Sequence, residues 1–196
     1  MVDLSLSLII PTVSRPTLAR TLMSLRGQAW RPGDEIILVG DGPQPIAADL
    51  WRQFGLPGRG TVETPARLGH WGHGARNWLL DARAAAGAYL MALDDDDEMA
   101  PGAVAAVRAA LTDNPGRPHI FRMTGDPCGG TAWRAKVIEH GNVGTPCLVA
   151  PNDPARLGRY APRHGGDCDF IRETCGQNPA GPVWREEVIA LIRPPT

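Results

Sequence analysis

The sequence lacks the features that identify several large classes of protein. It has no apolar run of roughly 18 residues or more, so no segment is expected to span a membrane. Its 20 basic and 21 acidic residues leave a formal net charge of −1. It also has no basic stripe, which argues against a general electrostatic affinity for nucleic acid or anionic lipid. Asp3 stands where a secretory signal would be positively charged, so a cytoplasmic protein is expected.

Cysteine is scarce, and the common nucleotide-loop motifs are absent. A chain of 196 residues can bury a core without a disulfide framework, and its cysteines form no C-x-x-C pair. We therefore expect unpaired thiols at Cys128, Cys147, Cys168 and Cys175. No Walker loop and no dinucleotide-binding glycine pattern occurs, so an ATPase or an NAD-dependent enzyme loses support.

Apolar segments alternate regularly through residues 1–111. Continuous or alternating apolar runs predict strands, and apolar residues at helical spacing predict helices. The expected strands are 4–10, 35–39, 61–64 and 88–93, and the expected helices are 17–25, 46–54, 74–86 and 103–111. This order predicts an α/β fold with a doubly wound, mostly parallel sheet flanked by helices.

Residues 112–196 are less regular, and glycine and proline are densest after Pro115. Strands are expected at 119–123 and 146–150 and a helix at 169–174, whereas 183–192 fits either a helix or a strand. No linker separates this loop-rich part from the rest. We therefore expect a single domain over residues 1–196.

The run Asp94–Glu98 is the most informative feature, because five acidic residues follow a buried strand directly. Like charges this close repel and need a compensating partner. In a parallel sheet, ligands bind beyond the carboxyl ends of the strands. A hard divalent cation such as Mn²⁺ or Mg²⁺ would satisfy both conditions, since it prefers oxygen ligands. The alternative is a solvated acidic loop.

Two further groups are expected near the same rim. Asp41 follows the strand 35–39, so it should lie close to Pro11, Thr12 and the acidic run, although Asp41-Gly42 is also typical of a simple turn. Arg76 opens the third helix. It could neutralise the acidic run, or its guanidinium could contact a phosphate.

Four segments, in order, resemble the family-2 glycosyltransferases with the GT-A fold. They are Leu8–Pro16, Glu35–Gly42, Gly74–Asn77, and Leu93–Glu98 followed by Pro101. The last resembles the D-x-D motif, which makes Asp94 its first aspartate and Asp96 the metal-binding one. The resemblance implies donor-binding residues around the nucleoside and diphosphate: Pro11, Thr12, Arg15, Asp41, Arg76 and Asp95.

The resemblance thins beyond residue 111. Gly165–Phe170 is similar to the family's E-D segment, which carries the catalytic base, but Gly166 stands where the glutamate would be. The resemblance therefore implies Asp167 as the base, with Asp169 as its substitute. The alternative is that these carboxylates only stabilise the start of a helix.

The function implied is a metal-dependent glycosyltransferase, inverting like most of the family. It would move a sugar from a nucleotide-sugar, with a UDP-sugar favoured, to the hydroxyl of an unknown acceptor. Residues 1–111 would bind the donor and 112–196 the acceptor, and nucleic acid would be a partner only as that acceptor. The alternatives are a non-catalytic module that binds a sugar nucleotide or a cation, and a nucleotidyltransferase, which would normally show a basic glycine-rich loop early in the chain.

Overall fold

A parallel sheet forms the first part of the fold. The computed structural model describes residues 2–58, 60–125 and 131–192. Its first four strands are all parallel and lie in the order β3-β2-β1-β4. They are β1 (Leu6–Thr12), β2 (Glu35–Gly40), β3 (Gly60–Glu63) and β4 (Tyr89–Ala92). The intervening helices are α1 (Leu18–Arg26), α2 (Pro45–Phe54) and α3 (His73–Asp81).

The later strands extend the same sheet beyond β4 in the order β8-β6-β9-β5, and β7 pairs with β6. They are β5 (Glu98–Met99), β6 (His119–Thr124), β7 (Thr131–Ala132), β8 (Leu148–Pro151) and β9 (Val183–Leu191). Helices α4 (Ala103–Asp113) and α5 (Gly166–Gly176) and a 3₁₀ turn at Thr145–Cys147 complete the chain. Strands β5, β7 and β8 run opposite to the others. The α/β class and the mostly parallel sheet are confirmed, and 183–192 is resolved in favour of a strand.

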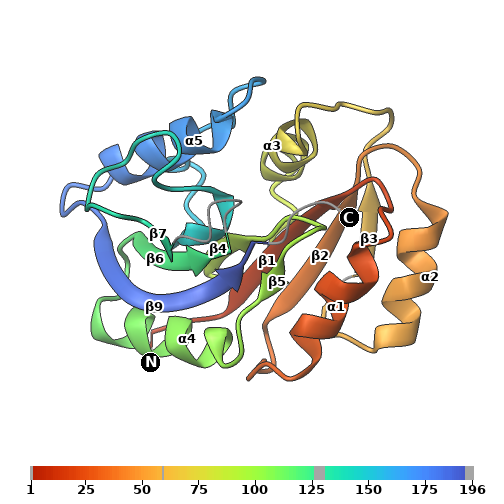
Figure 1. Ribbon diagram of the computed structural model, residues 1–196, viewed down its shortest axis with the longest axis horizontal. Coiled ribbons are helices and arrows are strands. Elements are labelled where there is room, and N and C mark those ends of the chain that lie inside the picture. The colour runs from red at the N-terminus through yellow and green to blue at the C-terminus, as the bar shows by residue number, and fades with distance from the viewer. Residues whose placement is uncertain (1, 59, 126–130, 193–196) are drawn as a thin grey trace.

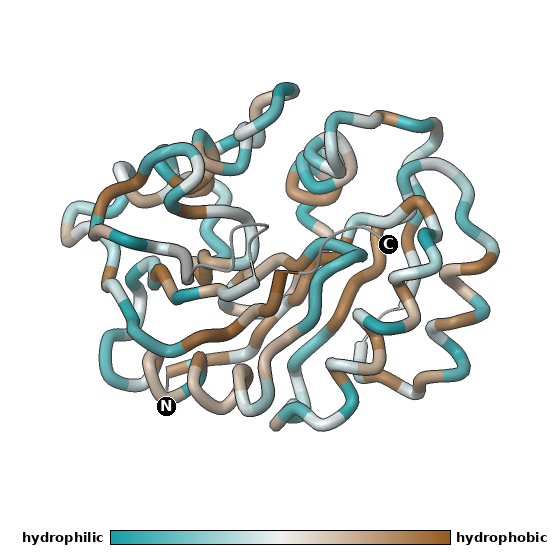
Figure 2. Tube along the Cα trace, viewed as in Figure 1, coloured by the Kyte–Doolittle hydropathy of each residue, from teal (hydrophilic) through white to brown (hydrophobic). Residues whose placement is uncertain are grey.

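The unbroken apolar runs of the central strands are explained by helices on both faces of the sheet (Figure 1). Leu8 and Leu38 point into the core shared with α1, α2 and α4. Their neighbours Ile9 and Val39 point to the opposite face and pack against α3. A strand buried on both faces has no polar side to show, which is why its sequence does not alternate. Figure 2 shows these hydrophobic segments crossing the middle of the molecule.

Several predicted boundaries differ from the structure by one or more residues. Strand β1 runs one residue beyond Pro11, because the Thr12 carbonyl still accepts a hydrogen bond from the Asp41 N–H (2.9 Å). Helix α3 ends at Asp81 rather than near 86, and Arg83 just after it has a left-handed backbone (φ 49°). Helix α5 begins at Gly166, three residues before the predicted start, so Asp167 lies inside its first turn.

Two other predictions concern thiols and membrane spans. Cys147, Cys168 and Cys175 are free and buried as expected, while Cys128 lies outside the described residues. Burial raises the pKa of Cys147 and of Cys175 to about 12 each, so both thiols stay protonated and unreactive at neutral pH. Within residues 2–58, 60–125 and 131–192, no helix is long and apolar enough to cross a bilayer.

Candidate active site

The carboxyl ends of β1, β2 and β4 meet at one cavity of about 160 Å³. In a parallel sheet these ends lie at the same edge, so residues far apart in sequence come together there. The cavity is lined by most of the residues predicted from sequence: Pro11, Thr12, Arg15, Asp41, Asp94, Asp95 and Asp96, with Val13, Trp71 and Gly72.

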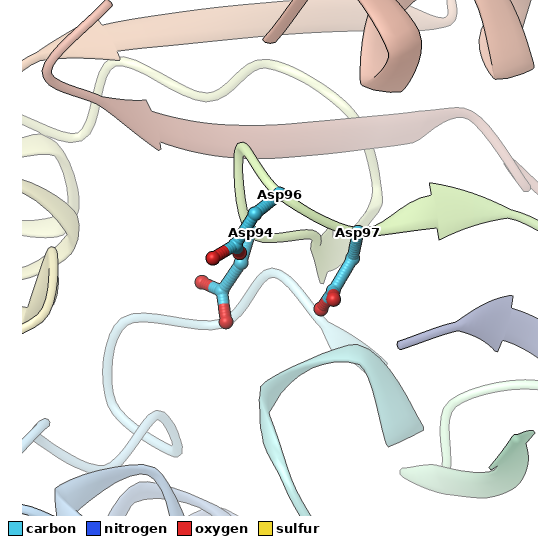
Figure 3. A group of neighbouring side chains, drawn as sticks. All are labelled: Asp94, Asp96 and Asp97. Carbon is cyan, nitrogen blue, oxygen red and sulfur yellow. The ribbon is translucent and has the colours of Figure 1, made fainter. Parts of the chain in front are cut away.

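The aspartates of the acidic turn between β4 and β5 fall into two groups, a cluster of three and a fourth that bonds to β1. Asp94, Asp96 and Asp97 each place a carboxylate oxygen within 4.8 Å of the other two, and Figure 3 shows all three side chains on this turn. Burial raises the pKa of Asp96, and the nearby Asp94 charge raises it further. Crowded carboxylate oxygens of this kind suit a hard divalent cation. The sequence located the acidic run, but it did not single out Asp97.

Asp95 is not a member of that cluster and bonds to the end of β1. Its Oδ2 accepts hydrogen bonds from the Thr12 hydroxyl (2.7 Å) and the Val13 N–H (3.4 Å). Burial raises its pKa, and these hydrogen bonds and Arg15 only partly oppose that effect. Asp95 therefore ties β4 to β1 at the floor of the cavity, which explains how four consecutive aspartates can serve different purposes.

Two arginines balance the acidic cluster in different environments. Arg15 is 46% exposed and pairs with Asp96 (2.7 Å), while Arg76 is only 1% exposed and pairs with Asp94. The Arg76 guanidinium also lies over the Tyr160 ring, 5.3 Å from its centre. Burial would lower the pKa of Arg76, but the adjacent Asp94 carboxylate reverses this, so the pKa is raised and Arg76 stays charged.

Asp41 holds a neighbouring loop rather than only ending a strand in a turn. Its two carboxylate oxygens accept hydrogen bonds from the backbone N–H groups of Leu68 (2.5 Å) and Gly69 (2.9 Å). The side chain is 5% exposed. Asp41 thus fixes the segment that leads into α3, a contact that sequence alone did not indicate.

A second cavity, of about 410 Å³, adjoins the first and contains Asp167. Asp94 and Arg76 also line it, so the predicted base and the acidic cluster face the same space. The Asp167 carboxylate accepts hydrogen bonds from the N–H groups of Thr145 (3.2 Å) and Cys168 (2.9 Å), which fix its position. Asp169, in contrast, pairs with Arg163 and Arg172 outside the described lining of this cavity.

The structure leaves no room for a side chain at Gly166, where the resemblance implies a glutamate. A side chain on Gly166 would place its Cβ 2.0 Å from the Ala161 carbonyl oxygen and 2.9 Å from Nδ1 of His73. His73 Nδ1 donates to that same carbonyl (2.9 Å), and its ring stacks on Tyr160. Burial lowers the pKa of His73, so the imidazole is neutral at pH 7. His73 also lines the second cavity. The sequence did not indicate a role for it, because histidines in a glycine-rich segment carry no specific signal.

Comparisons with known proteins agree with this arrangement. The family model for glycosyl transferase family 2 matches residues 7–142. TarS from S. aureus is 14% identical over 97% of this chain and 37% of its own, with a TM-score of 0.75. TarS 1–349 in complex with UDP-GlcNAc is 12% identical over 98% of this chain and 59% of its own, with a TM-score of 0.73.

A third solved structure is similar over the whole of this chain. The mannosyltransferase PcManGT from Pyrobaculum calidifontis, in complex with GDP-Man and Mn²⁺, is 18% identical over 100% of this chain and 59% of its own, with a TM-score of 0.68. At such identities the likeness shows the fold alone. This chain spans only 37% of TarS and 59% of PcManGT. No curated protein sequence matches it.

The fold and the acidic turn at the carboxyl end of β4 define the class, a GT-A-type α/β protein with a D-x-D-like site. The family match covers well over half of the sequence. The chain belongs to glycosyl transferase family 2, a family of enzymes.

Proposed function

We propose that this chain transfers a sugar from a nucleotide-sugar to an acceptor hydroxyl and that the reaction depends on a divalent metal. The observation that carries the proposal is the position of Asp94. This residue belongs to the acidic cluster and lines both cavities, one beside the ends of β1 and β2 and one beside Asp167. Sugar transfer needs the two cavities to be continuous, because the donor and the acceptor must meet.

The first cavity is proposed to bind the donor. Thr12, Asp41 and Asp95 would surround the nucleoside, since all three line this cavity. Asp94 and Asp96, together with Asp97, would hold Mn²⁺ or Mg²⁺, which when bound neutralises diphosphate charge and so stabilises the leaving nucleoside diphosphate. The buried, permanently charged Arg76 adds a fixed positive group beside the same position.

Asp167 is proposed as the general base in the second cavity. Two backbone N–H groups orient its carboxylate, and a proton acceptor is useful only when its position is fixed. It would take the proton of the acceptor hydroxyl as that oxygen attacks the anomeric carbon, a single displacement that inverts configuration. Residues 1–111 would thus serve the donor, and 112–196 would build most of the acceptor cavity.

A UDP-sugar is the favoured donor, and a GDP-sugar is the alternative. The UDP reading rests on the sequence resemblance and on the solved complexes of TarS with UDP-GlcNAc and with UDP. The GDP reading rests on the PcManGT complex, which also contains Mn²⁺. These ligands are properties of TarS and PcManGT, and for this chain they provide the two nucleotide-sugars to test.

The proposal is tested by the release of nucleoside diphosphate from UDP-GlcNAc and GDP-Man with Mn²⁺ and a panel of sugar acceptors. The matched variants are Asp167→Asn and Asp169→Asn, on the same turn of α5. We expect Asp167→Asn to bind donor normally and to lose transfer by about 10²–10⁴-fold. Asp169→Asn should retain transfer, because Asp169 pairs with arginines away from the cavity. Equal activity of the two variants would remove Asp167 from the base role.

A further inference from the structure

Trp71 is an exposed aromatic side chain on a strained loop beside the site. It is 61% exposed, and a protein of this size normally buries so large an apolar ring. The loop Gly69–Gly72 has four consecutive left-handed residues, with φ values of 69°, 57°, 54° and 77°. Two of them, His70 and Trp71, are not glycine, so each is held in a conformation that L-residues disfavour.

Contacts on both sides of the loop maintain this strained conformation. Before it, Asp41 accepts the N–H groups of Leu68 and Gly69. After it, the buried Arg76 donates through Nη1 to the Trp71 carbonyl (3.3 Å). Gly72 lies so close to Pro11 that a Cβ there would be 2.7 Å from the proline ring. Residues of the proposed donor site therefore fix the backbone of the loop that carries the Trp71 indole.

The position of the indole relates it to both cavities. Trp71 and Asp94 are the two residues common to the described linings of the 160 Å³ cavity and the 410 Å³ cavity. Trp71 also contacts His164, another residue that lines the second cavity, edge-on with ring centres 5.8 Å apart. On the proposed function, the nucleoside lies on one side of this boundary and the acceptor on the other. The group between them is the sugar to be transferred.

We infer that Trp71 forms one wall of the subsite for the donor's pyranose ring. The C–H face of a pyranose is apolar and flat, so it loses little by leaving water and gains contact area against an indole. The polar hydroxyls at the ring edge would remain free for Asp94, Arg76 and solvent. The inference rests on the proposed function, and it adds a residue that selects for the sugar part of the donor rather than for the nucleotide.

The test compares each nucleotide-sugar with its parent nucleotide, because only the difference reports on the sugar. Calorimetry with Mn²⁺ would give the affinities of UDP-GlcNAc, UDP, GDP-Man and GDP for the wild type, Trp71→Ala and Trp71→Phe. The control is Met23→Ala, a substitution of a 54% exposed apolar residue on α1. We expect Trp71→Ala to weaken nucleotide-sugar binding by about tenfold and to leave the nucleoside diphosphate within about twofold. Trp71→Phe should retain most of the preference, and Met23→Ala all of it.

Two results would overturn the inference while leaving the proposed function intact. One is an equal loss of affinity for nucleotide and nucleotide-sugar in Trp71→Ala, which would place the indole against the base. The other is no loss for either ligand. A wild-type protein that binds none of the four ligands would overturn the proposed function as well, so the two failures are distinguishable.

Discussion

Asp94 and Asp96 should contribute very differently to stability although both belong to the acidic cluster. Asp94→Ala removes the counter-charge of Arg76, which is 1% exposed, and leaves a buried guanidinium unpaired. Breaking one side of a fully buried ion pair costs about 3–5 kcal/mol, and the 39% exposure of Asp94 places this pair toward the lower end. Asp94 also repels Asp96, so its removal relieves some strain and the lower end, about 3 kcal/mol, is expected. Asp96→Ala instead leaves Arg15, which is 46% exposed, with Asp95 as a remaining partner (3.5 Å), and exposed pairs of this kind contribute about 0–1 kcal/mol.

Thermal unfolding in EDTA, followed by circular dichroism, measures this difference without any metal. For a chain of this length each kcal/mol moves the Tm by about 2–4 °C. Asp94→Ala should therefore lower the Tm by about 6–12 °C and Asp96→Ala by less than about 4 °C. Both variants should lose metal binding to a similar extent. If their Tm values agreed within error, Asp94 would not be the charge that keeps Arg76 buried, and the reasoning would fail.

Three further outcomes follow from individual contacts. Asp167→Asn should leave thermal stability nearly unchanged while transfer is lost, and a lower Tm of several degrees would instead indicate a structural role at the start of α5. His119 has its pKa lowered below the ordinary 6.5 by burial, so the unfolded chain binds the extra proton and stability falls as the pH drops through that region. His119→Gln should reduce the fall of the Tm between about pH 7.5 and about pH 5.5, and the fall that remains would come from His73, whose pKa burial also lowers. Gly166→Ala should lower the Tm, because its Cβ would lie 2.0 Å from the Ala161 oxygen. An unchanged Tm would show that the segment around Ala161 moves to make room for the methyl group.

Local sequence was enough to predict the sheet and the place of the site. Strands such as 35–39 are continuous apolar runs because helices cover both faces of the sheet, and that pattern is visible in the sequence itself. The ends of parallel strands share an edge whatever the loops do, so Thr12, Asp41 and Asp94 could be placed together before any coordinates.

The partition of roles within the site could not be predicted, because it depends on contacts between distant segments. Nothing local distinguishes Asp95, which bonds to Thr12, from Asp97, which joins the acidic cluster. Asp41 binds a loop 27 residues away, and His73 bonds to the carbonyl of Ala161, 88 residues away. The start of α5 was also misplaced, since glycine at its first positions disfavours a helix by propensity while the close packing there requires it.

The most direct test of the central claim is calorimetric titration of UDP-GlcNAc and GDP-Man into the protein with and without Mn²⁺. We expect at least one of them to bind with Mn²⁺, and we expect EDTA, Asp94→Ala and Asp96→Ala each to weaken that binding severely. A metal-anchored diphosphate at this turn would be contradicted if the nucleotide-sugar bound with unchanged affinity in EDTA and in both variants. It would also be contradicted if Asp96→Ala left the affinity for Mn²⁺ unchanged.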